Sequence, residues 1–397
     1  MLDKIPFEIK LEIMKRLPVK SLLQFRSVSK AWKSLIDSPD FIARYTALNS
    51  EPQLLLVTDH GILEKIYGII SDDYTFPKRK LILTIPQLLN QLTDDYRIIG
   101  SSNGLVCFYG NRHSSLNRMA VLWNPSIRKA VGVIVPNLGG GKGMYQSVLG
   151  FGVCGETMDP KILKITYIID NKDIDMESVN CIPSQVEVFT LSTGVWRSPY
   201  RNLPRKSVQF RRQPQVVVDG FLYWLATDKI TRDGGYNDIM SYSLIVSFDL
   251  TTEEFREVSL PDSLALAYHN NHVLLINKVK NSLVVIHHNE DVNNPVMGIW
   301  MRVDGVFTKL YDLKVNGRYE IVWGFRKNGA PIVQTKEVET EEVVEELFKR
   351  ELVVYEPSSK NMDSFWIHYA SSNVRVYPYM ETLLLLDQPD LMVYNDI

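Results

Sequence analysis

Cysteine is scarce in this sequence of 397 residues, with only Cys107, Cys154 and Cys181 and no C-x-x-C pair. An odd, sparse count fits neither a disulfide framework nor a cysteine-ligated metal site, and it favours a reducing compartment. No apolar run approaches the roughly 20 residues of a membrane-spanning helix. The start, MLDKIPFEIKLEIMKRL, carries charge in every turn, which argues against a secretory signal. We therefore expect a soluble protein of the cytoplasm, the nucleus or both, with no membrane partner.

An excess of charge of one sign is also lacking. The chain has 44 Lys and Arg residues against 46 Asp and Glu residues, for a net charge of −2. This balance gives no reason to expect nucleic acid or an anionic membrane surface as a partner. Apolar residues make up 45% and charged residues 23%, which is typical of globular proteins. A chain of this length exceeds one small core, so we expect two or more domains.

Catalytic and cofactor-binding motifs are missing as well. The glycine-rich stretch NLGGGKGMYQS lacks the P-loop pattern, because Pro136 stands where the first glycine is needed and Gly143 follows Lys142. His287 and His288 are neighbours in a predicted strand, so they point to opposite faces and would chelate a metal poorly. No serine-hydrolase or zinc-protease signature occurs. We expect no catalytic residue, no metal and no cofactor.

The chain begins with closely spaced helical patterns. FEIKLEIMKR alternates apolar and polar residues as a strand does, but Pro6, the early Glu8 and the late basic residues favour a helix. Such a helix is apolar on two opposite sides, one of them formed by Ile9, Ile13 and Leu17. PVKSLLQFR, SVSKAWKSLI and PDFIARYTAL indicate further short helices. About 45 residues cannot bury both sides of the first helix, so the excess apolar surface predicts a protein interface.

These first residues also resemble a known family, the F-box. The matching positions are Ile5-Pro6, Glu8, Ile13, Leu17-Pro18, Leu22, Arg26, Val28-Ser29-Lys30, Trp32 and Leu35, with Ile5 where the family usually has Leu. The resemblance implies docking onto a Skp-type adaptor, which links F-box proteins to a cullin–RING ubiquitin ligase. The adaptor-binding residues that we carry over are Pro6, Ile9, Ile13, Leu17, Pro18, Leu22, Val28 and Trp32. The alternative is that Ile9, Ile13 and Trp32 are only core residues packed against a second domain.

From about residue 50 the pattern changes to short strand-like runs separated by Asn-Gly, Asp-Gly and Pro-containing turns. An aromatic residue that ends an apolar strand before a turn recurs about every 50 to 70 residues. The five visible copies have Trp123, Phe189, Phe248, Trp300 and Tyr355. An all-strand unit of this length indicates a β-propeller blade. The first strands, PQLLLV and LEKIYGII, and the last, METLLLLD, predict a sixth blade built from both chain ends; five or seven blades remain alternatives.

Six segments of this second region carry a further resemblance: GSSNGLVCF, LWNPSIRK, GFGV, VEVFTLSTGVWRS, VVDGFLYWLA and SFDLTTEEFREVSLPDSL. In their residues and in their order along the chain, these segments resemble the F-box-associated, kelch-like β-propeller domain of the large plant F-box family. GFGVCGETMDPK departs from the family, which often has a Tyr-Asp pair after these glycines. The resemblance implies recognition of a client protein rather than catalysis, and it does not identify the client.

The expected fold class is therefore α+β with several domains: a helical F-box over residues 1–47, followed by an all-β propeller over residues 50–390. The expected function is that of the substrate-recognition subunit of an SCF-type cullin–RING ubiquitin ligase, without enzymatic activity of its own. A propeller enzyme with a site assembled from distant loops and a scaffold outside any ligase remain alternatives. Candidate client contacts are the irregular loops Gly110–Met119, Pro136–Tyr145, Arg201–Gln213 and Asp228–Asp238, and then the acidic stretch Glu337–Glu346.

Overall fold

The computed structural model divides the chain into two compact units. One comprises Met1–Leu56, Ile66–Asn137 and Tyr377–Ile397, and the other comprises Val57–Lys65 and Leu138–Val376. The structure describes residues 6–48, 53–59, 65–77, 80–113, 117–137, 145–168, 185–199, 203, 208–211, 213–231, 239–266, 272–289, 296–313, 318–337, 349–359, 361–369 and 373–394. The first unit therefore combines the N-terminal helices with strands from both halves of the sequence.

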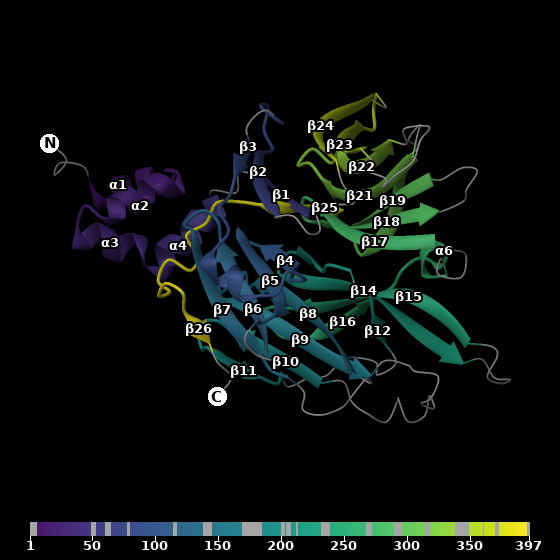
Figure 1. Ribbon diagram of the computed structural model, residues 1–397, viewed down its shortest axis with the longest axis horizontal. Helices are drawn as coiled ribbons and strands as arrows, with labels where there is room; N and C mark the ends of the chain where they lie inside the picture. Colours follow the sequence, from purple (N-terminus) through teal and green to yellow (C-terminus); the bar gives the residue numbers. More distant parts are fainter. Residues whose placement is uncertain are drawn as a thin grey trace. The chain divides into compact units, whose positions relative to one another are not determined.

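Four short helices open the chain, drawn in purple in Figure 1: α1 (Phe7–Met14), α2 (Val19–Arg26), α3 (Lys30–Ile36) and α4 (Pro39–Leu48). Proline precedes α1 and α2, where a missing N–H costs no helical hydrogen bond. The hydroxyl of Ser29 accepts a hydrogen bond from Trp32 N at 3.2 Å, and that of Ser38 accepts one from Phe41 N at 3.3 Å. These side chains satisfy donors at the starts of α3 and α4. None of the described helices is both long and apolar enough to cross a membrane.

The rest of the described chain forms six sheets, the blades of a propeller. In chain order, the first blade consists of β4 (Arg97–Ser102), β5 (Leu105–Asn111), β6 (Arg118–Asn124) and β7 (Lys129–Val135), and the second of β8 (Tyr145–Val153), β9 (Pro160–Ile168), β10 (Gln185–Thr190) and β11 (Val195–Arg197). The third blade consists of β12 (Gln209–Phe210), β13 (Val216–Val218), β14 (Phe221–Thr231), β15 (Ile239–Asp249) and β16 (Phe255–Val258). The fourth consists of β17 (His272–Val279), β18 (Ser282–Asn289), β19 (Val296–Val303) and β20 (Val306–Leu313), and the fifth of β21 (Arg318–Phe325), β22 (Pro331–Glu337), β23 (Lys349–Glu356) and β24 (Asn361–Tyr369). Two short helical turns, η2 (Gln87–Gln91) and α6 (Asp262–Ala265), lie between strands. The predicted fold class, helices followed by a six-bladed all-β propeller, is confirmed.

The sixth blade is built from both ends of the propeller region, as the sequence predicted. Its strand order is β25 (Asn373–Tyr379), β1 (Gln53–Asp59), β2 (Ile66–Ser71) and β3 (Lys80–Ile82). The predicted closing strand METLLLLD is wrong, however, because NVRVYPY forms β25. The four leucines Leu383–Leu386 instead lie in consecutive turns after β25, and they are buried. A buried turn and a buried strand both need a short apolar run, so the sequence pattern does not separate them.

The repeated aromatic residue occupies the third strand of each of five blades: β6, β10, β15, β19 and β23. Four of these side chains are buried, and that of Trp300 is half-buried. In the second unit, Phe248 belongs to an apolar cluster with residues of the preceding blade, such as Ile165. The sequence repeat therefore marks a position that packs inside the propeller.

Candidate functional site

Large apolar side chains are exposed on the N-terminal helices. Ile9 and Ile13, one turn apart on α1, are 52% and 50% exposed. Phe25 at the end of α2 is 40% exposed, and Val28 between α2 and α3 is 67% exposed. The half-buried ring of Trp32 on α3 lies 6.2 Å from that of Phe25, centroid to centroid. We call these five residues the helical apolar surface; such a group of exposed apolar residues is typical of protein contacts.

A salt bridge between Arg26 and Asp37 connects α2 with the end of α3, next to Phe25 of this surface. Arg26 Nε lies 2.6 Å from Asp37 Oδ1, and Arg26 Nη2 lies 2.9 Å from Asp37 Oδ2. The hydrogen bond to Asp37 raises the pKa of Arg26 above its ordinary value, against the opposing effect of burial. A two-bond arginine–carboxylate contact restrains orientation as well as distance. It therefore keeps Phe25 and Trp32, on either side of the α2–α3 turn, in a fixed relation.

The structure places most of the predicted adaptor-binding residues at or near the surface. Pro6 and Pro18 are exposed, and Leu17 is half-buried. Leu22, in contrast, is 0% exposed, so it cannot contribute direct contact area in this conformation. Phe25 is not among the predicted residues, because its sequence context marks it only as a large apolar residue three positions before Val28. That an adaptor binds to these residues stays a prediction.

Seven apolar residues of the helices are buried: Met14, Val19, Leu22, Ile36, Phe41, Ile42 and Tyr45. Their burial shows which side of each helix faces inward. On α1, Met14 is buried, whereas Ile9 and Ile13, on another side of the helix, are exposed. The two-sided apolar pattern of α1 therefore has one buried side and one exposed side, as an interface helix requires.

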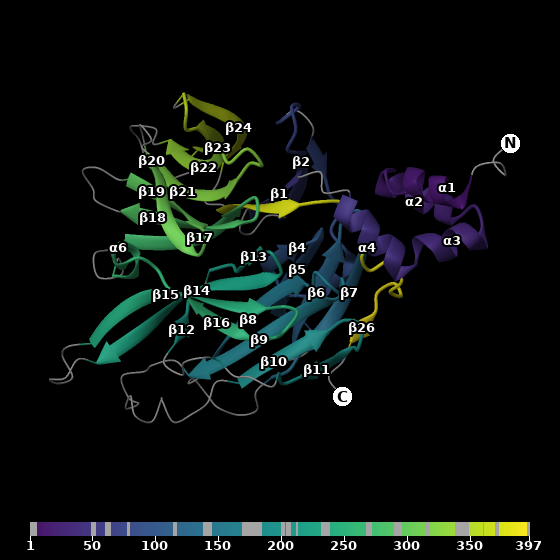
Figure 2. The same ribbon diagram turned by 180° about the vertical axis from the view of Figure 1, so that it is seen from behind.

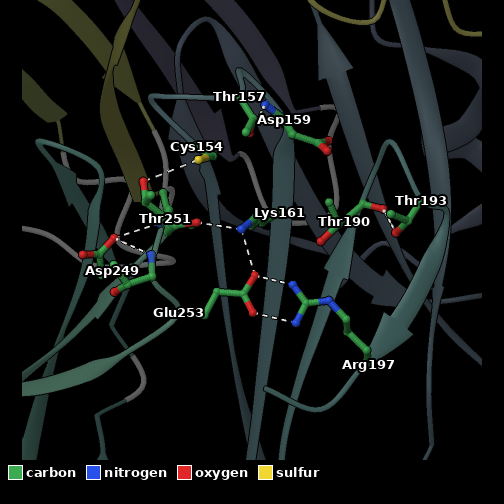
Figure 3. Close-up of polar contacts among 12 residues, drawn as sticks. Cys154, Thr157, Asp159, Lys161, Thr190, Thr193, Arg197, Asp249, Thr251 and Glu253 are labelled. Atoms are coloured by element: carbon green, nitrogen blue, oxygen red, sulfur yellow. Dashed lines mark hydrogen bonds and ion pairs between the residues drawn. The ribbon is translucent and has the colours of Figure 1, made fainter. Parts of the chain in front are cut away.

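A second group of polar residues lies between two blades of the second unit (Figure 3). Lys161 on β9 donates to the carbonyl of Leu250 at 2.7 Å and to Glu253 Oε1 at 2.8 Å. Arg197 on β11 contacts both carboxylate oxygens of Glu253, at 2.5 and 2.7 Å. Glu253 belongs to the turn between β15 and β16, so the group, here called the Glu253 cluster, joins the third blade to the second.

The electrostatics of the Glu253 cluster favour a structural role. Burial alone would raise the pKa of Glu253, but hydrogen bonds from Arg197 and Lys161 outweigh it and leave the pKa below the ordinary value of 4.5. A carboxylate held ionised by two cations is a poor proton acceptor, whereas general bases have pKa values near the working pH. The cluster is therefore suited to joining blades rather than to acid–base catalysis.

Cys154 lies next to the Glu253 cluster, and its thiol contacts the hydroxyl of Thr251 at 3.6 Å (Figure 3). Burial raises the pKa of this thiol, but hydrogen bonds from Thr157 and Thr251 more than compensate and lower it below its ordinary value of 9.0. Cys154 as a whole is only 1% exposed, so a reagent in solution has little access to the sulfur. Within the described ranges, no group of three or more His, Cys, Asp or Glu residues is arranged to hold a metal ion.

The candidate client loops fall mainly outside the described residues. This holds for residues 114–116, 138–144 and 232–238 within three of the loops, for most of Arg201–Gln213, and for all but the first residue of Glu337–Glu346. The client-binding site consequently stays a prediction.

Comparisons with known proteins match both parts of the chain. A model of the F-box domain matches residues 2–44, and a model of the F-box associated beta propeller domain matches residues 63–322. The F-box protein At3g07870 of Arabidopsis thaliana is 25% identical, over 98% of this chain and 93% of that protein. The F-box/kelch-repeat protein At3g23880 of the same plant is 23% identical over 65% of each chain. Among solved structures, TolB from Acinetobacter baumannii overlaps 83% of this chain and 67% of its own, at 11% identity and a TM-score of 0.42, a likeness too weak to support an argument.

Proposed function

Since this chain belongs to the F-box proteins with an F-box associated beta propeller domain, we propose that it is the substrate-recognition subunit of an SCF-type cullin–RING ubiquitin ligase. The observation that carries this proposal is the helical apolar surface. Its members Ile9, Ile13 and Val28 are each at least half exposed, on a segment that matches the F-box. Covering such side chains gains roughly 25 cal/mol per Å² of apolar area, which favours a partner on this side. A Skp-type adaptor is the partner that we propose.

The proposed mechanism is proximity rather than bond chemistry. The helices hold the adaptor, and through it the cullin–RING ligase, while the propeller holds a client protein. A client lysine is thereby kept near a charged ubiquitin-conjugating enzyme, which raises its effective concentration. The chain itself needs no catalytic residue for this role. We propose the cytoplasm, the nucleus or both as the compartment, which suits the free buried thiols of Cys107 and Cys154.

The direct test is co-purification of the full chain with a Skp-type adaptor. The variant Ile9→Asp with Ile13→Asp places two charges on the helical apolar surface, and each would be buried without a partner in the complex. One unpaired buried charge costs several kcal/mol, so we expect adaptor affinity to fall by at least about 100-fold. The melting temperature should change little, because both side chains are half exposed in the free protein.

A matched control is available on α4. Leu48 is 59% exposed and lies outside the helical apolar surface, so Leu48→Asp places a charge on an exposed apolar position elsewhere on the helices. We expect this variant to bind the adaptor as the unmodified chain does. Equal loss of binding in both variants, or full binding by the Ile9 and Ile13 variant, would remove the support for an adaptor site on these residues.

A further inference from the structure

The segment that follows the last propeller strand is buried although it has no regular structure. We call Met380–Gln388 the C-terminal clamp. Thr382 and Leu383 are fully buried, and Leu384, Leu385 and Leu386 are nearly so. In Figures 1 and 2 this yellow segment passes beside α4 before it reaches the short strand β26 (Val393–Tyr394), which pairs with β7. Helices, clamp and the blade of β4–β7 all belong to the first unit.

On one side the C-terminal clamp is bonded to the blade of β4–β7. The buried side chain of Asn124 donates to the carbonyl of Thr382 at 3.0 Å and to that of Leu384 at 2.7 Å. Lys129 Nζ donates to the carbonyl of Leu386 at 3.0 Å and to that of Gln388 at 2.6 Å. Four backbone carbonyls of the C-terminal clamp thus accept hydrogen bonds from two side chains of a single blade. Such bonds replace those that a regular strand or helix would provide to buried carbonyls.

On its other side the C-terminal clamp contacts two of the N-terminal helices. Glu381 Oε2 accepts a hydrogen bond from Val19 N, the first residue of α2, at 3.3 Å. Pro18 offers α2 no side-chain cap, so Glu381 places its negative charge where the helix dipole favours it. The hydroxyls of Thr382 and Thr46 on α4 lie 3.3 Å apart, and both residues are buried. The clamp therefore holds the helix that bears Phe25 as well as the helix next to the propeller.

A glycine in the blade marks how closely the C-terminal clamp approaches. Gly104 lies in the β4–β5 turn with φ +79°, and an added Cβ would lie 2.6 Å from Thr382 Cγ2 and closer still to the carbonyl oxygen of Met380. Gly220 in the β13–β14 turn has the same φ of +79°, but an added Cβ there would have no atom within 4 Å. The two glycines share the backbone requirement, and only Gly104 also makes room for the clamp.

We propose that the C-terminal clamp is a positioning element that sets the orientation of the adaptor-binding helices relative to the blade of β4–β7. It rests on the proposed function in that the orientation matters because a ligase assembles on these helices. A ubiquitin-charged enzyme reaches a client lysine only from a limited range of positions, so one held orientation raises effective concentration more than a mobile tether does. Residues at the far end of the sequence then contribute to the geometry of the ligase without touching the adaptor.

The test measures the spread of distances between two spin labels in the full chain. Labels are placed by Lys33→Cys on α3 and Asn90→Cys in η2, both exposed positions of the first unit, with Cys181→Ser to limit labelling. Cys107 and Cys154 are buried. Gly104→Ala is compared with the parent and with the matched control Gly220→Ala. If Gly104→Ala does not fold, the double variant Thr46→Val with Glu381→Gln replaces it in the comparison. This variant weakens only the contacts between the C-terminal clamp and the helices. Adaptor binding is measured on the unlabelled proteins.

We expect a narrow distance distribution for the parent and for Gly220→Ala, and one at least about twice as broad for Gly104→Ala, with adaptor affinity unchanged in all three. A distribution for Gly104→Ala as narrow as that of the parent overturns the proposal. Equal broadening in the two glycine variants also overturns it, because hairpin strain alone would then be the cause. If the distributions are as expected and no protein binds the adaptor, the proposed ligase function is wrong while the clamp itself stands.

Discussion

Neutralising Glu253 should destabilise the propeller far more than breaking a surface ion pair. The substitution Glu253→Gln keeps the shape of the side chain and removes the charge that faces Lys161 and Arg197 (Figure 3). The Lys161 side chain is 11% exposed, so water replaces little of the lost interaction, and the carbonyl of Leu250 becomes its main acceptor. The change therefore leaves a cation that is nearly buried and poorly compensated.

The expected magnitude follows from the exposure of each partner. Breaking a fully buried pair costs about 3 to 5 kcal/mol, and the remaining Leu250 contact and the residual exposure reduce this to about 2 to 3 kcal/mol. The Arg197 side chain is 43% exposed, so its own pairing contributes about 0 to 1 kcal/mol. We therefore expect Glu253→Gln to be much more destabilising than Arg197→Ala, although both break contacts of the same carboxylate.

Thermal unfolding followed by circular dichroism at pH 7 tests this order. For a unit of this size a loss of 2 to 3 kcal/mol lowers the melting temperature by about 4 to 12 °C. The control is Lys309→Ala, which breaks the exposed pair with Asp312, whose side chains are 44% and 39% exposed. A melting temperature for Glu253→Gln within about 1 °C of this control would refute the reasoning, because the cluster would then contribute no more than a surface pair.

Three further predictions concern the helices, the pH dependence of the Glu253 cluster and the buried thiols. Leu22→Ala should cost about 2 to 5 kcal/mol of stability because the side chain is buried, whereas Phe25→Ala should lower adaptor affinity with little change in melting temperature. Because folding lowers the pKa of Glu253, its charge stabilises the fold at pH above the ordinary value of 4.5. The difference in stability between the parent and Glu253→Gln should therefore shrink as the pH falls through the lowered pKa. A difference in stability that grows on acidification would contradict this. Cys107 and Cys154 should react with a thiol reagent only after urea unfolding, as mass spectrometry of the labelled peptides can check, since both are buried in the fold.

The sequence by itself determined those features that depend on neighbouring residues. Pro6, Pro18 and Ser29 mark helix starts because an N-terminal turn has free donors and tolerates proline, whatever surrounds it. The recurring aromatic residue, for example Phe189 and Phe248, revealed five of the blades because four of these blades bury the same position of the third strand and one half-buries it. The excess of apolar residues on α1 likewise predicted an interface from composition and periodicity alone.

Tertiary structure decided which of two similar residues is inside and what distant segments meet. Leu22 and Phe25 lie three positions apart on α2, and only the packing of the helices buries the first and exposes the second. Leu383–Leu386 read as a strand, yet the donors of Asn124 and Lys129 on another blade accommodate this segment as turns. Glu381 caps α2 from the other end of the chain, at a separation of 362 residues. Contacts of this kind form only once the blades and helices have assembled, so no local pattern in the sequence encodes them.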